Sequence, residues 1–155
     1  MREPDIQQHD IQPGRLAVLD GPECWDLLRS QPVGRIAWSG SQGMSVVPVN
    51  YAVAEDEAIV LRTTPYSLLA RDVADRDVAF EVDHVDAAHH EGWSVLVRGR
   101  CVRQRHTPEH PEPWVTGPRF LGLRIEARSV SGRRVLPATG SAAAAQSAVD
   151  AFFTA

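Results

Sequence analysis

The sequence predicts a single all-β domain, a closed or nearly closed antiparallel barrel with short helices at its periphery. Three observations support this fold class. Six or so β-type runs recur at regular spacing along the 155 residues, and residues that favour turns separate them. Several of these runs alternate apolar and polar side chains, as strands with one buried face do. The apolar share of 43% suffices for one core, and no repeat or shift in composition marks a second domain.

The N-terminal part of the chain is expected to contain one helix. Residues 1–14 are polar and are expected to form a flexible arm, so that the domain itself covers residues 15–136. Asp20 can cap the start of a helix, and Pro22 fits its first turn. This helix is expected to end near Ser30.

Three strands are expected after this helix, at Val33–Trp38, Met44–Val53 and Ala58–Thr63. Residues typical of turns join them, at Ser39–Gly43 and Ala54–Glu57. Pro48 lies within the second of these strands. Because proline cannot donate a ladder hydrogen bond, we expect a free edge or a bulge there.

The second half of the domain is expected to hold one helix and three further strands. The helix is predicted at Pro65–Ala74, and the strands at Val78–Asp83, Gly92–Arg105 and Phe120–Val130. Polar loops are predicted at His84–Glu91 and His106–Gly117, and a turn at Ser131–Arg134. Residues 137–155 form an Ala-rich tail that can be helical.

Charge and composition exclude several classes of function. The formal charge is −4, which gives no basic surface for a nucleic acid or an anionic membrane. All 16 basic residues are arginine, so a Schiff-base lysine and a P-loop lysine are both excluded. No apolar run approaches the roughly 20 residues that span a bilayer. The N-terminus lacks the apolar segment of a signal peptide, and we expect a cytoplasmic protein.

The two cysteines, Cys24 and Cys101, are far apart and form no metal-binding motif. They are expected to be reduced thiols in the core. His84, His89 and His90 fall in a polar loop, where adjacent histidines diverge, and we expect no metal site there. No nucleophile with a neighbouring base stands out, so we assign no catalytic residue.

One corner of the predicted fold suits a phosphate. A β-type run ends in Arg62, Thr63 and Thr64, and Ser67 follows at the start of the predicted helix. A guanidinium can grip a phosphate with paired hydrogen bonds, while hydroxyls and a helix N-terminus add further donors. Each residue also has an ordinary interpretation, as a strand-end arginine, a β-former or a helix cap.

Several short motifs follow one another along the chain: Pro32–Ala37, Val47–Tyr51, Leu61–Thr64 with Ser67, Val78–Asp83, Gly92–Gly99, Pro113–Trp114 and Ser131–Arg134. In this order they resemble a known family, the pyridoxamine 5′-phosphate oxidase-like split β-barrel flavoproteins, and especially its small nitroimidazole-reductase-like bacterial branch. The resemblance covers about residues 15–136. Each is weak alone, and their order makes the match specific.

The resemblance implies a homodimer that binds FMN at the subunit interface, with F420 or haem in some relatives. It implies that the strand carrying Val47, Pro48, Val49 and Asn50 passes along the flavin ring. It also implies that the segment Arg62–Ser67 holds the phosphate. A third segment, with Trp93, Ser94 and Val95, is implied to contact the flavin from the partner subunit.

The chain departs from the family pattern at one position. The family has a basic residue after the serine of the phosphate segment, whereas Leu68 follows Ser67 here. Arg62 and Arg71 are the nearest alternatives, and Arg71 lies one helical turn after Ser67. Loss of one charged hydrogen bond costs on the order of 1.5–3 kcal/mol. The substrate-phosphate motif of the true pyridoxamine phosphate oxidases is also missing, so vitamin B6 oxidation is not expected.

The sequence allows two roles for each of two tryptophans, Trp93 and Trp114. Trp93 can be a core residue or a flat wall beside a flavin in an interface, and Trp114 can cover a pocket or contact a second subunit. Three functions therefore stand: a flavin-dependent oxidoreductase that reduces a small acceptor, a non-catalytic flavin, F420 or haem binder, and a barrel with an empty site.

Overall fold

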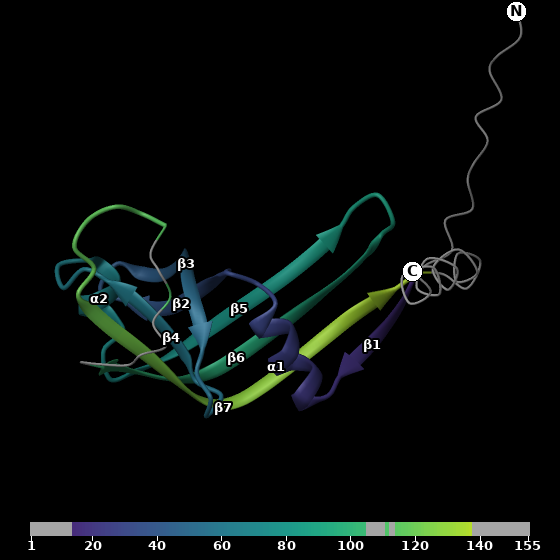
Figure 1. Cartoon of the computed structure of the whole chain (residues 1–155), viewed down its shortest axis with the longest axis horizontal. Helices are drawn as coiled ribbons and strands as arrows, with labels where there is room; N and C mark the ends of the chain where they lie inside the picture. Colours follow the sequence, from purple (N-terminus) through teal and green to yellow (C-terminus); the bar gives the residue numbers. More distant parts are fainter. Residues whose placement is uncertain (1–13, 105–110, 112–113, 138–155) are drawn as a thin grey trace, which may run out of the picture.

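The computed structural model describes residues 14–104, 111 and 114–137. Within them the chain forms seven strands and two helices (Figure 1). The strands are β1 (Arg15–Leu19), β2 (Val33–Gly40), β3 (Gly43–Val53), β4 (Ile59–Thr63), β5 (Arg76–Asp86), β6 (Glu91–Gln104) and β7 (Leu121–Leu136). The helices are α1 (Gly21–Arg29) and α2 (Leu68–Asp72). No described helix is long and apolar enough to cross a membrane.

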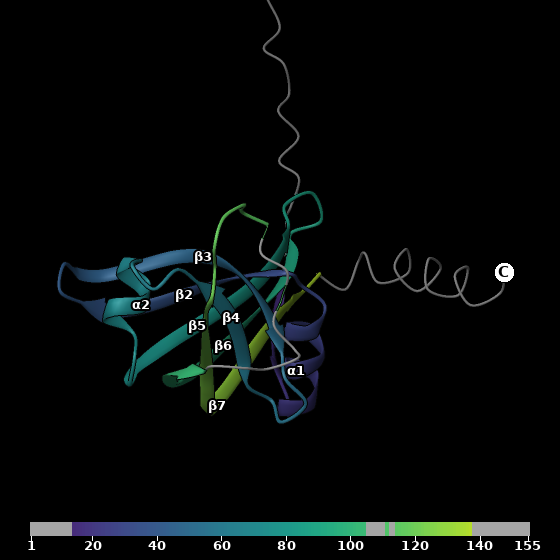
Figure 2. The same cartoon turned by 60° about the vertical axis from the view of Figure 1, so that its left-hand side comes forward.

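The strands form one antiparallel sheet in the order β1-β7-β4-β3-β2-β5-β6, and an additional β6–β7 pairing closes it into a barrel. β7 is long enough to pair with β4 at its start and with β1 at its end. The long strands β5, β6 and β7 extend beyond the barrel, away from α2 (Figures 1 and 2). The predicted antiparallel barrel is therefore confirmed.

The interior of the barrel is apolar. Its largest fully buried side chains are Phe80, Leu28, Ile36, Ile59, Leu61, Leu123 and Ile125. The Tyr51 ring meets Phe80 edge to face, with centroids 4.8 Å apart. The Tyr51 hydroxyl donates to the Leu28 carbonyl of α1, and burial raises the pKa of this hydroxyl, so it stays protonated as a donor.

The helix α1 forms as the sequence predicts. The Asp20 side chain accepts from the Glu23 N–H at 2.9 Å, and the Glu23 carboxylate accepts from the Asp20 N–H at 3.2 Å. This reciprocal capping box fixes the start of the helix. Its buried residues Cys24, Trp25 and Leu28 then seal one side of the barrel.

Pro48 lies on a free edge, as expected. Residues 43–50 of β3 pair with β2, whereas only Tyr51–Val53 pair with β4. Within the described residues, the other side of β3 near Pro48 is therefore unpaired, and the missing N–H costs no ladder hydrogen bond. The strands β3 and β4 diverge here, and the candidate site lies beside the point where they separate.

Three expectations were wrong. Residues 15–19 form β1, where no strand was expected, and β5 continues to Asp86, into the first part of the loop predicted at His84–Glu91. The predicted turn at Ser131–Arg134 lies inside β7. Gly132 is needed for another reason: a Cβ there would lie 2.7 Å from the Cys24 sulfur and 2.9 Å from a Leu19 methyl. The glycine therefore allows α1 to pack closely on β7.

The helix predicted at Pro65–Ala74 is a single turn, Leu68–Asp72. The predicted arm at residues 1–14 lies outside the described residues except for Gly14, and most of the loop 106–117 and of the tail 137–155 also lies outside them.

Candidate functional site

The turn between β4 and α2 is fixed by hydroxyl groups. The Ser67 hydroxyl donates to the Thr64 carbonyl at 2.9 Å and accepts from the Ala70 N–H at 3.0 Å. The Thr63 hydroxyl lies 2.9 Å from the Ser67 hydroxyl. Because the Ser67 proton is directed to Thr64, Thr63 is the donor in this pair. Both hydroxyl protons thus hold the turn itself.

One positive charge at this corner comes from Arg62. It is exposed at the end of β4 and has no hydrogen bond or ion pair among the described residues. The helix α2 has only five residues, so its dipole adds little. We conclude that an anion here would be bound mainly by guanidinium groups.

Arg62, Thr63 and Ser67 line a hollow of about 480 Å³, whose opposite wall is the free-edge part of β3. We call it the corner cavity. Its lining residues are Trp38, Ser45, Val46, Val47, Pro48, Val49, Arg62, Thr63, Ser67, Leu68, Leu69 and Arg119. Two sequence-predicted segments, 47–49 and 62–67, thus meet around one space. Thr64 is half-buried and Arg71 exposed, and neither lines this cavity.

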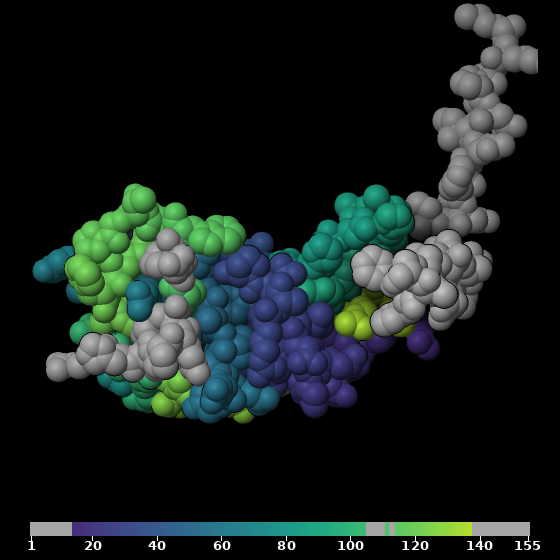
Figure 3. Space-filling model, viewed as in Figure 1, coloured from purple at the N-terminus to yellow at the C-terminus, as the bar shows by residue number. Residues whose placement is uncertain are grey.

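A second hollow of about 310 Å³ adjoins the first and shares Pro48, Val49, Arg62 and Arg119 with it. We call it the tryptophan cavity, because Trp114 lines it together with Val115 and Asn50. The Asn50 side chain accepts from the Trp114 N–H at 3.2 Å and donates to the Pro32 carbonyl at 3.5 Å. Asn50 thus ties the segment that precedes β7 to β3, and the two lie side by side in Figure 3 (green and blue).

Arg119 is the residue that the sequence analysis missed. It lines both cavities from the segment before β7 and is half-buried. Nothing local marks it, because a single arginine beside an apolar strand is a common strand-end residue. Only the antiparallel pairing of β7 with β4, which matches Leu121 with Thr63, brings it to the corner.

The third predicted segment lies elsewhere. Trp93 and Ser94 line a separate hollow of about 640 Å³, together with Leu16, Val85 and Val135. This far-end cavity shares no lining residue with the other two, and residues on both sides of the β5–β6 turn line it. Figure 1 shows this hairpin at the opposite end of the sheet from α2. Val95 is 0% exposed, in the barrel core. One chain therefore does not bring Trp93 and Ser94 to Arg62.

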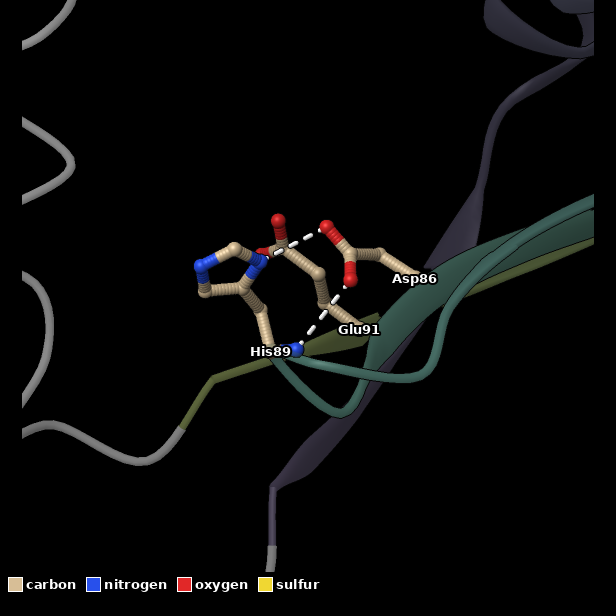
Figure 4. Close-up of side chains that lie close together, drawn as sticks. All are labelled: Asp86, His89 and Glu91. Carbon is tan, nitrogen blue, oxygen red and sulfur yellow. Dashed lines mark hydrogen bonds and ion pairs between the residues drawn. The ribbon is translucent and has the colours of Figure 1, made fainter.

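A polar cluster closes the β5–β6 hairpin beside the far-end cavity (Figure 4). The Asp86 carboxylate accepts from the N–H groups of Ala88 and His89, and its other oxygen lies 2.7 Å from His89 Nδ1. The hydrogen bond to Asp86 raises the pKa of His89, and the same bond lowers the pKa of Asp86. One possible metal-ligating atom from each of Asp86, His89 and Glu91 lies within 4.8 Å of the other two. These hydrogen bonds explain the cluster as a structural feature that closes the hairpin.

No acid–base group of the described residues lines the corner or the tryptophan cavity; neither contains a carboxylate, an imidazole or a thiol. Both cysteines are buried and unpaired, and burial raises the pKa of the Cys101 thiol to about 12. The two cavities can therefore bind and orient a ligand, but their described residues offer no side chain for general-base chemistry.

Known proteins resemble this chain in sequence. The family model described as pyridoxamine 5′-phosphate oxidase matches residues 20–134. An uncharacterised protein of Mycobacterium tuberculosis, Rv0080, is 30% identical over 129 residues, which cover 76% of this chain and 84% of that protein.

Solved structures resemble it in fold. A structure of the FAD-binding protein from Mycobacterium smegmatis has 28% identity and a TM-score of 0.63, and covers 77% of this chain and 98% of its own. A candidate 5-nitroimidazole antibiotic resistance protein from Bacteroides thetaiotaomicron has 13% identity and a TM-score of 0.61, and covers 79% and 89%. This second likeness shows the fold alone. The family resemblance and the split-barrel fold class expected from the sequence are confirmed.

Proposed function

Because the chain belongs to the pyridoxamine 5′-phosphate oxidase family, we propose that it is a flavin-binding homodimer, with FMN as cofactor and a small molecule as electron acceptor. The observation that carries this proposal is the corner cavity. It joins the free-edge wall of β3 to the cationic end of β4 in one space of ligand size.

The residues of the corner cavity fit a flavin phosphate and ring. An isoalloxazine ring needs a flat apolar wall, which Pro48 and Val49 can supply. A phosphate needs cationic donors, and Arg62 has no carboxylate partner among the described residues. The hydroxyls of Thr63 and Ser67 hold the turn, so we assign them the positioning of Arg62 rather than the main charge on the phosphate.

The chemistry in this proposal belongs to the cofactor: bound flavin supplies a carrier for hydride and electrons between a reduced nicotinamide or F420 and a small acceptor such as a quinone or nitro compound. The chain's residues bind the phosphate, orient the ring and shape the space for the acceptor. The absence of an acid–base side chain in the two cavities of the described structure agrees with this division of roles.

The far-end cavity supports the homodimer. It carries an apolar surface formed by Leu16, Val85 and Val135, which are 59%, 70% and 38% exposed. Trp93 and Ser94 line the same hollow, which shares no lining residue with the corner cavity that contains Arg62. A second copy that covers this surface would bury it and would bring Trp93 and Ser94 of one subunit to the corner cavity of the other. We place this dimer in the cytoplasm, where buried thiols stay reduced.

The first experiment is the absorption spectrum of the purified protein, followed by titration with FMN. We expect flavin bands or saturable quenching of FMN fluorescence at micromolar concentration, and weaker binding for Arg62→Ala. Light scattering measured on the same samples reports the mass of the assembly. A protein that binds neither FMN, FAD nor F420 would refute the proposal, and a Soret band would replace flavin with haem.

A non-catalytic flavin carrier is the second candidate, because no described side chain in the cavities can serve as an acid or base. Turnover separates the two functions. Protein saturated with FMN is mixed with NADH, NADPH or reduced F420, with a quinone and a nitroaromatic compound as acceptors. Cofactor oxidation above the rate of free FMN supports the oxidoreductase, whereas full occupancy without turnover supports the carrier.

A further inference from the structure

The corner cavity lacks a basic residue where the family resemblance expects one. Leu68 follows Ser67, and the first turn of α2 carries no charged residue that could replace it. Arg71 lies in the last turn of this short helix, is exposed and lines neither cavity. If the site takes a phosphate, its second cation must come from another part of the chain.

Arg119 satisfies this requirement by its position. β4 and β7 pair with Thr63 opposite Leu121. Arg119 precedes Leu121 by two residues, so it lies level with the turn that follows Thr63. The hydrogen bond from the Trp114 N–H to Asn50 holds the start of the same segment against β3. Arg119 thus approaches the corner from the segment before β7 and not from α2.

The charges around Arg119 favour an anionic ligand. Arg62 and Arg119 line the same two cavities, and neither forms a hydrogen bond or ion pair among the described residues. Elsewhere on the barrel Arg35 is paired, with Glu81 at 3.2 Å and Asp83 at 2.8 Å. Two arginines therefore line one space in which the described residues supply no carboxylate as a counter-ion. A dianionic phosphate would supply that counter-ion.

We propose that Arg119 and Arg62 together bind the ligand's phosphate. Arg119 supplies the positive charge that the family motif carries at the position of Leu68. The flavin form of this proposal rests on the proposed function, whereas the binding of phosphate by the two arginines does not. Because Arg62 and Arg119 line both cavities, the proposed phosphate position is the space that the two cavities share, beside Pro48.

A comparison of FMN with riboflavin tests the role of Arg119, since riboflavin lacks the phosphate. We expect Arg119→Ala to weaken FMN binding about tenfold or more and to leave riboflavin binding unchanged. Arg119→Lys should restore part of the loss. Arg71→Ala is the matched control and should change neither affinity. An equal loss for both flavins, or a loss of FMN binding caused by Arg71→Ala and not by Arg119→Ala, would overturn the proposal.

A titration with inorganic phosphate separates this proposal from the flavin function. Arginine Nε–Hε signals are observed by NMR and assigned by their loss in Arg62→Ala and Arg119→Ala, whose folding is checked by circular dichroism. We expect both signals to shift saturably while that of Arg71 stays in place. If both shift and no flavin binds, the arginine pair stands and the flavin function fails. If phosphate leaves the Arg119 signal unmoved, the pair is rejected whether or not flavin binds.

Discussion

Substitution of Gly132 by alanine should destabilise the domain, because α1 packs directly on this residue. A Cβ at Gly132 would lie 2.7 Å from the Cys24 sulfur, 2.9 Å from Leu19 Cδ1 and 3.2 Å from Leu19 Cβ. Cys24 and Leu19 are only 1% and 7% exposed, so neither side chain can move into solvent. Overpacking of this kind costs about 1–3 kcal/mol, more than the ~0.4–1 kcal/mol gained when alanine restricts the unfolded chain.

Thermal unfolding followed by circular dichroism measures this cost. The net cost, after the gain from the unfolded chain is subtracted, is at most about 2.6 kcal/mol; at about 3 °C per kcal/mol for a chain of this size, Gly132→Ala should lower the Tm by up to about 8 °C. Gly21→Ala is the control, since no atom lies within 4 Å of the Cβ it would add. Cys24→Ala removes the sulfur, so in that background Gly132→Ala should cost about 1 kcal/mol less. A neutral Gly132→Ala, or an equal cost with and without the sulfur, would refute the packing argument.

Three further predictions follow from the contacts around the cavities. Every hydrogen-bond partner of the buried Asp72 carboxylate is a donor, including the N–H of Ser41 at 3.3 Å, so the NH₂ group of an asparagine would face donors. Asp72→Asn should therefore lower the free energy of unfolding by about 1–3 kcal/mol, measured by chemical denaturation. In an NMR titration the pKa of His89 should lie above its usual value of about 6.5, and Asp86→Asn should bring it back toward that value. The pair stabilises the hairpin most at pH values between the lowered pKa of Asp86 and the raised pKa of His89. This stabilisation is lost as the pH falls below the pKa of Asp86 or rises above the pKa of His89. Trp93→Ala should weaken FMN binding in the proposed dimer even though Trp93 lines neither cavity of its own Arg62 corner, and an unchanged dissociation constant would argue against a contribution from the partner.

The elements that were predicted correctly carry local signals. The helix α1 was found because Asp20 and Pro22 mark its start, and Asp20 caps it as expected. Pro48 was placed at a free edge or a bulge because proline is chemically excluded from a paired strand interior. In both cases the determining interaction lies within a few residues, so the sequence alone contains it.

The missed features depend on contacts between distant residues. β1 is five residues long, and its residues 16–19 are all apolar, so the sequence shows no period of two although Leu16 and Val18 are exposed and Leu19 is buried. Its partner lies in the last part of β7, more than 100 residues later. Gly132 was taken for a turn residue because a glycine required by a neighbouring helix looks the same in sequence. Arg119 gives no local signal at all.

The positions of the cavities suggest how the two halves of the proposed site divide the binding energy. The corner offers charge, through Arg62 and Arg119, whereas the far end offers apolar area, through Leu16, Trp93 and Val135. A phosphate needs only the first, while an isoalloxazine ring gains from both. In the proposed dimer, inorganic phosphate should therefore bind with the same affinity at all protein concentrations, because one chain holds both arginines. Flavin affinity should instead fall when dilution separates the subunits, since the flavin then loses its apolar contacts with the partner subunit.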